Sequence, residues 1–273
     1  MRASWPATTL LVFGIFPLSG IALGDDLTIY DVQYSVDPSG VSPHADQIHN
    51  VVGGIVTYMA AGNRDRVYLQ TPGASAWGGI CVKDAHHELL GQLQVGDLVT
   101  FSNIYIEDDV DTTENTFLQF DRSVAPDVSV SIVGHDVGLV PDPLLLSAQD
   151  LLVDPVDHAV TEPYESVIVM LQDIEIGALD LGRKGDNYEL KQWNVDHWDV
   201  AWGTDYINID AEGDYHPWIH SGALFTSITG LVEQNTKSGW DYYQLLTRSS
   251  ADLVPEPSSL LLLAAVAVLL RRR

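Results

Sequence analysis

The feature that most constrains the fold is a succession of short runs rich in β-branched and aromatic residues, flanked by Gly, Pro, Asn or Asp. Such runs predict β-strands, and the flanking residues predict turns. The first half contains Val51–Met59, Arg66–Gln70, Gly79–Val82, Leu98–Glu107 and Thr116–Phe120. The second half contains Ser166–Ile176, Asn187–Gln192, Tyr206–Ile209, Leu224–Glu233 and Tyr242–Leu246. The chain is therefore expected to be all-β and to contain an internal duplication.

The order of the predicted elements indicates a type of barrel. A short helix is expected over Asp84–Leu90, closed by Gly91, between the third and fourth strands. Five strands with a helix in that place follow the order of an OB-fold barrel. Gly53 and Gly54 lie inside the first strand, which must bend sharply because it serves both sides of a small barrel. We therefore predict two OB-like five-stranded barrels in tandem, with a short helix in each.

A proline-containing segment separates the two halves. Val140-Pro-Asp-Pro143 predicts an extended, Pro-rich linker, and the Ser-containing apolar segment up to Leu152 predicts a short packed helix. The predicted organisation is a signal peptide (1–24), a first OB-like domain (25–135), a linker with a short helix (136–160), a second OB-like domain (161–253) and a sorting signal (254–273). Each barrel is expected to fold independently, because few contacts should cross such a linker.

Both ends of the chain have the composition of sorting signals. Met1-Arg2, an apolar stretch and the small-residue end Ala22–Gly24 follow the order of a secretory signal peptide. At the other end, Pro255-Glu256-Pro257 precedes the apolar run Leu260–Leu270 and the basic tail Arg271-Arg272-Arg273. An apolar helix of that length rises about 17 Å, less than the ~30 Å hydrocarbon core. It therefore predicts a temporary anchor in the inner membrane, with the arginines held in the cytoplasm.

This C-terminus closely resembles the PEP-CTERM sorting signal of Gram-negative bacteria, in which motif, apolar helix and basic tail occur in the same order. The resemblance covers about 20 residues. It implies transient recognition by an exosortase, a membrane enzyme that handles the tail at the Pro-Glu-Pro element. It also implies export to the cell envelope or the extracellular space. A plain tail anchor is the alternative interpretation.

The body of the chain carries a second resemblance, spread over short motifs. Val67-Tyr-Leu-Gln70, Val95-Gly-Asp-Leu-Val99 and Tyr243-Gln-Leu-Leu-Thr-Arg-Ser249 look like the OB-fold region that precedes the nuclease module in large secreted bacterial nucleases. The chain departs from that pattern because a sorting signal, and no nuclease module, follows the second half. The resemblance therefore implies a binding or spacing module and transfers no catalytic residue.

The charge balance argues against nonspecific binding to nucleic acid. The formal net charge is −25, and removal of both ends would make the chain more acidic. Such a surface repels phosphate backbones at long range and favours divalent cations. The cations that could still form a basic groove are Arg64, Arg66, Arg183, Lys184 and Lys191. The single cysteine, Cys81, lies in an apolar run and is expected to be a packed core thiol.

Two groups of residues are candidates for ligand binding. Asp109, Asp111 and Glu114 alternate in a predicted loop and can converge on Ca²⁺, although the loop does not match an EF-hand. Asp210–Asp214 is a second acidic stretch of this kind, and ordinary solvated loops are the alternative for both. Trp193, Trp198 and Trp202 surround the third strand of the second half, where stacking on sugars or bases competes with burial in a core.

The sequence contains no recognised catalytic motif. His86 and His87 are adjacent, so their side chains diverge on a strand or a helix and make a poor pair of metal ligands. We expect a non-catalytic cell-surface or extracellular matrix protein that binds a polysaccharide, another polymer or a partner protein, with no cofactor other than a candidate calcium ion. The alternatives are an accessory single-stranded or extracellular DNA-binding protein and an enzyme with an unrecognised carboxylate site.

Overall fold

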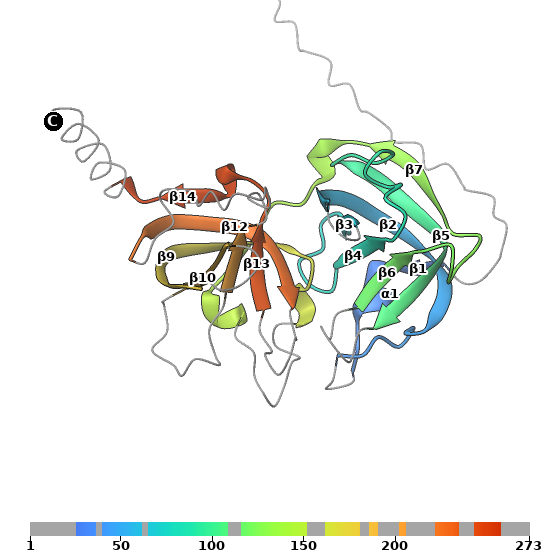
Figure 1. The fold of residues 1–273 in the computed structure, drawn as a ribbon, viewed down its shortest axis with the longest axis horizontal. Helices are drawn as coiled ribbons and strands as arrows, with labels where there is room; N and C mark the ends of the chain where they lie inside the picture. Colours follow the sequence, from blue (N-terminus) through green and yellow to red (C-terminus); the bar gives the residue numbers. More distant parts are fainter. Residues whose placement is uncertain are drawn as a thin grey trace, which may run out of the picture.

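The structure is a computed structural model that describes residues 26–36, 40–61, 65–108, 116–151, 162–180, 186–190, 202–205, 222–234 and 243–257. In these residues the strands form two sheets of seven strands each. Figure 1 shows the two sheets as neighbouring barrels, the first from the blue and green part of the chain and the second from the yellow to red part. The predicted all-β chain with two OB-like barrels is confirmed.

The first sheet closes on itself. Its strands are β1 (Asp26–Thr28), β2 (Gln47–Ala60), β3 (Asp65–Gln70), β4 (Gly79–Asp84), β5 (Asp97–Asp108), β6 (Thr116–Phe120) and β7 (Ser129–His135). Their order is β1-β2-β3-β4-β6-β5-β7, and β2 also pairs with β5, so five of the strands form a ring. Within the ring only β4 and β6 run parallel. This is the strand order of an OB-fold barrel.

β2 bends so that it can serve both sides of the first ring. Gln47–Ile55 pairs with β5, and Ile55–Ala60 pairs with β3. Gly53 lies beside this change of partner and has a φ of 81°, a conformation that side chains with a Cβ rarely adopt. A Cβ on Gly54 would lie 3.1 Å from side-chain atoms of Leu69. The bend expected at the two glycines is therefore confirmed.

The second sheet repeats the arrangement of the first. Its strands are β8 (Leu144–Leu146), β9 (Ile168–Asp180), β10 (Asp186–Leu190), β11 (Trp202–Asp205), β12 (Leu224–Gln234), β13 (Tyr243–Thr247) and β14 (Leu253–Pro255). The order is β14-β12-β13-β11-β10-β9-β8, with an additional pairing of β12 with β9 that closes the ring. Here β11 and β13 are the parallel pair. The segment predicted as a linker thus contributes a strand, β8, to the second sheet.

The duplication extends beyond the two rings. β1 runs parallel to β2, and β8 runs parallel to β9, so each ring receives an added strand at the same place. β7 pairs antiparallel with β5, and β14 pairs antiparallel with β12. Each sheet is therefore a unit of seven strands with the same topology.

The same turn follows the added strand in each unit. The Thr28 backbone N–H and hydroxyl both donate to the Asp31 carboxylate, at 2.8 and 2.6 Å, and helix α1 (Ile29–Gln33) begins there. The Ser147 N–H and hydroxyl donate to the Asp150 carboxylate at 2.8 Å, and the 3₁₀ helix η2 (Ala148–Leu151) begins there. In both units the carboxylate accepts an N–H group that a helix start leaves without a partner, and at α1 the Thr28 hydroxyl also accepts the Asp31 N–H at 3.2 Å.

One predicted element is wrong, and another falls outside the described residues. The helix expected over Asp84–Leu90 is a series of turns. The Asp84 carboxylate accepts the N–H groups of His86 and Leu89, at 2.9 and 2.7 Å, and His87 has a φ of 58°, which interrupts any helix. The third strand of the second half lies at Trp202–Asp205, before the expected Tyr206–Ile209, which falls outside the described residues.

Each barrel has its own apolar core. In the first, alternate residues of the ring strands point inward, including Val67, Leu69, Val82 and Leu118. In the second, the core gathers residues of β9, β12 and β13 together with Leu253 of β14. A third cluster contains residues of both barrels and is described next.

Candidate functional site

The outer face of the first barrel is buried along β3, β4 and β6, of which β3 and β4 are the second and third strands of the ring. Tyr68 of β3, Cys81 of β4 and Phe117 of β6 form one cross-strand row. They lie on the outer face, because strand residues alternate between faces and their neighbours Val82 and Leu118 belong to the barrel core. All three are nevertheless buried. Something other than the first core must therefore cover them.

The cover is the second barrel. Ile168 of β9, Leu231 of β12 and Leu246 of β13 form a matching cross-strand row and share one buried cluster with the first row. The face that includes the second and third strands is the one through which OB folds bind oligonucleotides and oligosaccharides. In the first barrel this face is already occupied by the second barrel.

Polar contacts also join the two barrels. Arg66 Nη1 lies 2.7 Å from Glu233 Oε1, and the Tyr68 hydroxyl donates a short hydrogen bond to the same oxygen. The Ile168 N–H donates to Gln70 Oε1 at 3.1 Å, in a buried position. These bonds satisfy polar groups that would otherwise be costly to bury. The junction is therefore specific as well as apolar.

The backbones of the two barrels approach closely at one point. A Cβ on Gly79 would lie 2.4 Å from the carbonyl carbon of Ser166, so only glycine fits there. Nearby, the Trp77 N–H donates to the Pro163 carbonyl oxygen at 2.6 Å. The expectation that few contacts would cross between the barrels is wrong, because an apolar row on each barrel needs the other for burial.

The ladders identify the corresponding face of the second barrel. In the parallel β4–β6 pair, Cys81 lies opposite Phe117. In the parallel β11–β13 pair, Trp202 lies opposite Gln244. The two positions correspond. Leu118 follows Phe117 and belongs to the first core, and Leu245 follows Gln244 and belongs to the second core.

The third member of the row follows from the neighbouring strand. Tyr68 lies opposite Cys81 in the β3–β4 ladder, as Glu189 lies opposite Trp202 in the β10–β11 ladder. The row of Tyr68, Cys81 and Phe117 in the first barrel therefore corresponds to the row of Glu189, Trp202 and Gln244 in the second. We call these last three residues the second-barrel row.

The second-barrel row differs in chemistry from its counterpart. The first row is apolar and suits permanent burial, whereas the second combines a tryptophan with a carboxylic acid and an amide. None of the contacts between barrels described above comes from β10 or β11, whereas β13 contributes Leu246 to the junction, and Gln244 lies opposite Glu233, which pairs with Arg66. Aromatic rings stack on the apolar faces of sugars, and acid and amide groups accept or donate hydrogen bonds to hydroxyls. By residue type and strand register, the row therefore differs from the buried row of the first barrel.

Most of the other predicted site residues lie outside the described part of the chain. These are Trp193, Trp198, Asp109, Asp111, Glu114, Arg271, Arg272 and Arg273. In the residues that are described, no group of three or more His, Cys, Asp or Glu side chains has the arrangement of a metal site. The calcium site at Asp109, Asp111 and Glu114 stays a prediction.

The Pro-Glu-Pro element is continuous with the second barrel. Pro255 is the last residue of β14 and lies opposite Phe225 of β12. The Glu256 N–H donates to the Leu224 carbonyl oxygen at 3.0 Å. Leu253 is buried in the core of the second barrel. No helix of the described residues combines the length and the apolar composition needed to cross a membrane.

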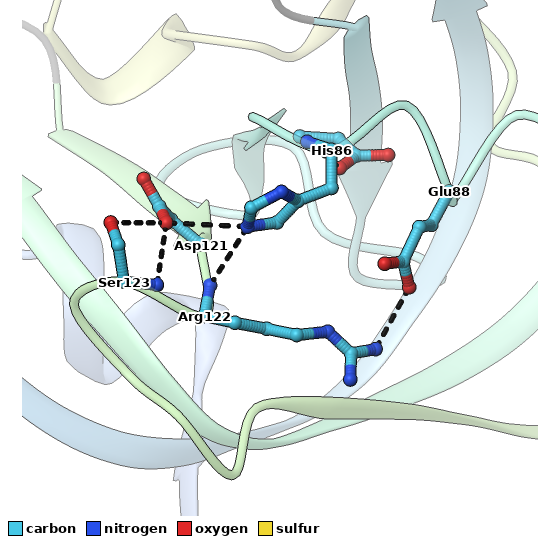
Figure 2. Close-up of polar contacts among 6 residues, drawn as sticks. His86, Glu88, Asp121, Arg122 and Ser123 are labelled. Carbon is cyan, nitrogen blue, oxygen red and sulfur yellow. Dashed lines mark hydrogen bonds and ion pairs between the residues drawn. The ribbon is translucent and has the colours of Figure 1, made fainter.

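A cluster of polar residues at the rim of the first barrel resembles a hydrolase triad in composition only (Figure 2). The Ser123 hydroxyl donates to Asp121 Oδ1 at 2.6 Å, whereas a nucleophilic serine would bond to the histidine. The Arg122 N–H donates to His86 Nε2 at 3.1 Å and occupies the lone pair that a general base needs. Hydrogen bonds from Ser123 hold the pKa of Asp121 below its usual value. The cluster therefore fixes a turn.

The two adjacent histidines contact different carboxylates. His86 Nε2 lies 3.4 Å from Asp121 Oδ1, and His87 Nδ1 lies 3.0 Å from Asp65 Oδ1. Two rings held by separate partners do not converge on one ion. This arrangement agrees with the expectation that the pair is a poor metal site.

Every lysine and arginine side chain in the described residues is engaged. Three arginines pair with carboxylates at 2.7–2.9 Å, and one lysine lies 3.3 Å from the centre of an aromatic ring. The pairs are Arg66 with Glu233, Arg122 with Glu88, Arg248 with Asp252, and Lys83 with Phe117. This part of the chain therefore presents no row of uncommitted cations to a phosphate backbone.

Comparison with known proteins found no matching family model and no matching curated protein. Among solved structures, the tetrameric p202 HIN2 domain is 12% identical with a TM-score of 0.34, covering 78% of this chain and 92% of that one. Fission yeast Pot1 with single-stranded DNA is 11% identical with a TM-score of 0.31, covering 78% and 84%. The Ifi202 HINa domain with double-stranded DNA is 9% identical with a TM-score of 0.31, covering 78% and 96%. Similarities this low carry no argument about function.

Proposed function

We propose that the chain is an exported, non-catalytic binding protein that holds a polysaccharide on the outer face of its second barrel. Trp202 stacks on a sugar ring, and Glu189 and Gln244 bond to sugar hydroxyls. Trp193 and Trp198 precede β11 in the sequence and are part of the same proposal, although they lie outside the described residues. The protein acts at the cell surface or in an extracellular matrix.

The observation that carries this proposal is the correspondence between the two rows. The first-barrel row is apolar and is buried in the junction. A ligand that binds this face of an OB-like barrel can therefore bind only the second barrel. On that barrel the central position of the row is a tryptophan. Stacking on an aromatic platform is worth about 1–3 kcal/mol per ring in comparable nucleobase sites.

Charge favours a sugar polymer over a nucleic acid as the ligand. The row contributes an acid, Glu189, to a chain of formal net charge −25. The described cations are engaged with partners in the chain itself. Uncharged sugars bring no phosphate to be repelled, whereas DNA would need a basic groove.

The export part of the proposal is supported by the two ends of the sequence. A basic, apolar and small-residue order at the N-terminus suits a secretory signal peptide. The Pro-Glu-Pro element, apolar run and arginine tail suit transient membrane anchoring and handling by an exosortase. The absence of catalysis is proposed because the rim cluster lacks the bonding pattern of a triad.

The site is tested by measuring the affinity of wild type and of Trp202→Ala for a panel of neutral and acidic polysaccharides. We expect the variant to bind about 5- to 150-fold more weakly, which corresponds to loss of ~1–3 kcal/mol of stacking. Its melting temperature should be unchanged, and Trp202→Phe should retain most of the affinity.

Trp77→Ala is the matched control, because Trp77 lies in the turn between β3 and β4 of the first barrel, outside the proposed site. It should leave the affinity unchanged. Single-stranded DNA, tested between about 50 and 200 mM salt, is the rival ligand, and its binding should weaken steeply with salt if cations hold it. DNA binding without polysaccharide binding would refute the proposed ligand.

A further inference from the structure

The junction between the barrels contains a buried carboxyl group that the proposed binding function does not use. Glu165 precedes β9, and only 3% of its surface is exposed. Its side chain hydrogen-bonds to the backbone of Thr116 on β6 and to the Gln33 side chain on α1, both in the first barrel. Its Oε2 has no hydrogen-bond partner among the described residues. A carboxyl group of the second barrel is therefore inserted into the first.

The groups that face Glu165 are predominantly acidic. Glu162, in the 3₁₀ helix η4 (Glu162–Tyr164), is 4% exposed, and Asp108 lies at the end of β5. Glu162 accepts the Tyr243 hydroxyl at 2.7 Å, so a neutral donor serves that carboxylate. Asp108 accepts the Thr116 hydroxyl at 3.1 Å. Among the described residues, the charged groups that act most strongly on Glu165 are both acids.

These surroundings favour the protonated form of Glu165. Burial raises the pKa of Glu165 well above its usual value, and the charges of Glu162 and Asp108 raise it further. When the barrels separate, the carboxyl group reaches water and regains an ordinary pKa. The closed junction therefore binds a proton that the open junction releases.

We infer that Glu165 makes the junction a pH-sensitive joint, which stays closed while this carboxyl group holds its proton and opens as the proton is lost. The stabilisation is complete below the ordinary pKa of a glutamic acid. It declines as pH rises toward the raised pKa of the closed state. Between these limits, the ratio of open to closed molecules increases up to tenfold for each pH unit.

The chain supplies its own reporter for opening of the joint. Cys81 is the single cysteine, is 2% exposed, and lies in the row that Ile168, Leu231 and Leu246 cover. Burial also raises the pKa of its thiol to about 12, so the closed form is unreactive. A thiol reagent therefore modifies Cys81 only when the second barrel moves away.

The experiment measures the rate of Cys81 modification by 4,4′-dithiodipyridine in the full-length chain across the acid to mildly alkaline range. Glu165→Gln keeps the shape but cannot ionise, so at each pH the ratio of wild-type to variant rate cancels the reactivity of the thiol itself. We expect this ratio to rise with pH by at least tenfold. Glu88→Gln, which removes an acid from the rim of the first barrel, should behave like wild type.

A second variant guards against misfolding of Glu165→Gln. Glu162→Gln removes the neighbouring charge with the largest effect, so the pH-dependent rise in Cys81 modification should end at a lower pH and span a smaller range, because the pKa of Glu165 in the closed joint is then raised less. Circular dichroism at each pH separates opening of the joint from global unfolding. A rate ratio that does not change with pH, together with an unmoved profile in Glu162→Gln, would overturn the inference.

Discussion

Replacing Leu231 by Ala should weaken both barrels at once. Leu231 is fully buried, lies on β12 opposite Ile168 and Leu246, and covers the apolar row of the first barrel. Burial of each CH₂ group contributes ~0.8 kcal/mol, so removal of three carbon atoms costs ~2.4 kcal/mol before any cavity is counted. The remaining cavity raises the expected loss in the free energy of unfolding to about 3 kcal/mol.

Urea denaturation followed by two probes tests this prediction. Far-ultraviolet circular dichroism reports both barrels, and protection of Cys81 from thiol reagents reports the junction. At a pH below the ordinary pKa of a glutamic acid, where the joint is closed, we expect the two transitions to coincide and to shift together in Leu231→Ala, because each barrel buries the other's outer row. Leu145→Ala is the matched control, since Leu145 lies on β8 and is 56% exposed, and it should change stability by less than about 0.5 kcal/mol.

Two outcomes would refute the reasoning. A Leu231→Ala variant within about 0.5 kcal/mol of wild type would show that the row contributes little, against the usual cost of truncating a buried leucine. Two separate unfolding transitions, of which only the transition of the second barrel shifts in the variant, would also refute it. They would show that the barrels fold independently, as the sequence alone suggested.

Three further predictions concern other features of the chain. Gly79→Ala should destabilise the junction by about 1–3 kcal/mol, because its Cβ would lie 2.4 Å from the Ser166 backbone. Faster labelling of Cys81 would reveal this loss, and a labelling rate equal to that of wild type would contradict the close approach. Thr28→Ala should lower the free energy of unfolding by ~1 kcal/mol through loss of the α1 cap, while Thr28→Ser should retain it, as measured by thermal denaturation. Glu256→Ala should leave the chain in the inner membrane with its arginine tail, as fractionation and intact mass would show; normal release would refute handling at the Pro-Glu-Pro element but not export.

The strands of both rings could be predicted where apolar and β-branched residues dominate, as in β5 and β12. β11 could not, because it is only four residues long and two of them, Gly203 and Asp205, belong to types depleted in strands, so its pairing with β13 and β10 imposes the conformation. The segment after β4 forms turns in place of the predicted helix, because the His86 and Leu89 N–H groups donate to the Asp84 carboxylate and this competes with helical bonds. Pairing with distant parts of the chain decided the first case, and local bonds to one side chain decided the second.

The junction escaped prediction although the sequence contained a signal for it. β3 reads Asp65-Arg-Val-Tyr-Leu-Gln70, with apolar residues on both faces, and Gly79-Ile-Cys-Val82 shows the same pattern in β4. A strand that is apolar on both faces needs cover on both sides. Which element supplies the cover depends on the position of the second barrel, and no local pattern specifies that position. The second-barrel row likewise required the ladder registers.

The continuity of β14 with the Pro-Glu-Pro element has a mechanical consequence for a chain held by its tail. Force applied at the C-terminus and directed away from the sheet loads the Glu256 N–H to Leu224 bond first, then the pairs of β14 with β12 in order from Pro255 to Leu253. Hydrogen bonds that are loaded one after another break under much smaller forces than hydrogen bonds that are sheared together. The buried side chain of Leu253 is the first apolar contact to resist, so the last strand would yield to traction before either ring does.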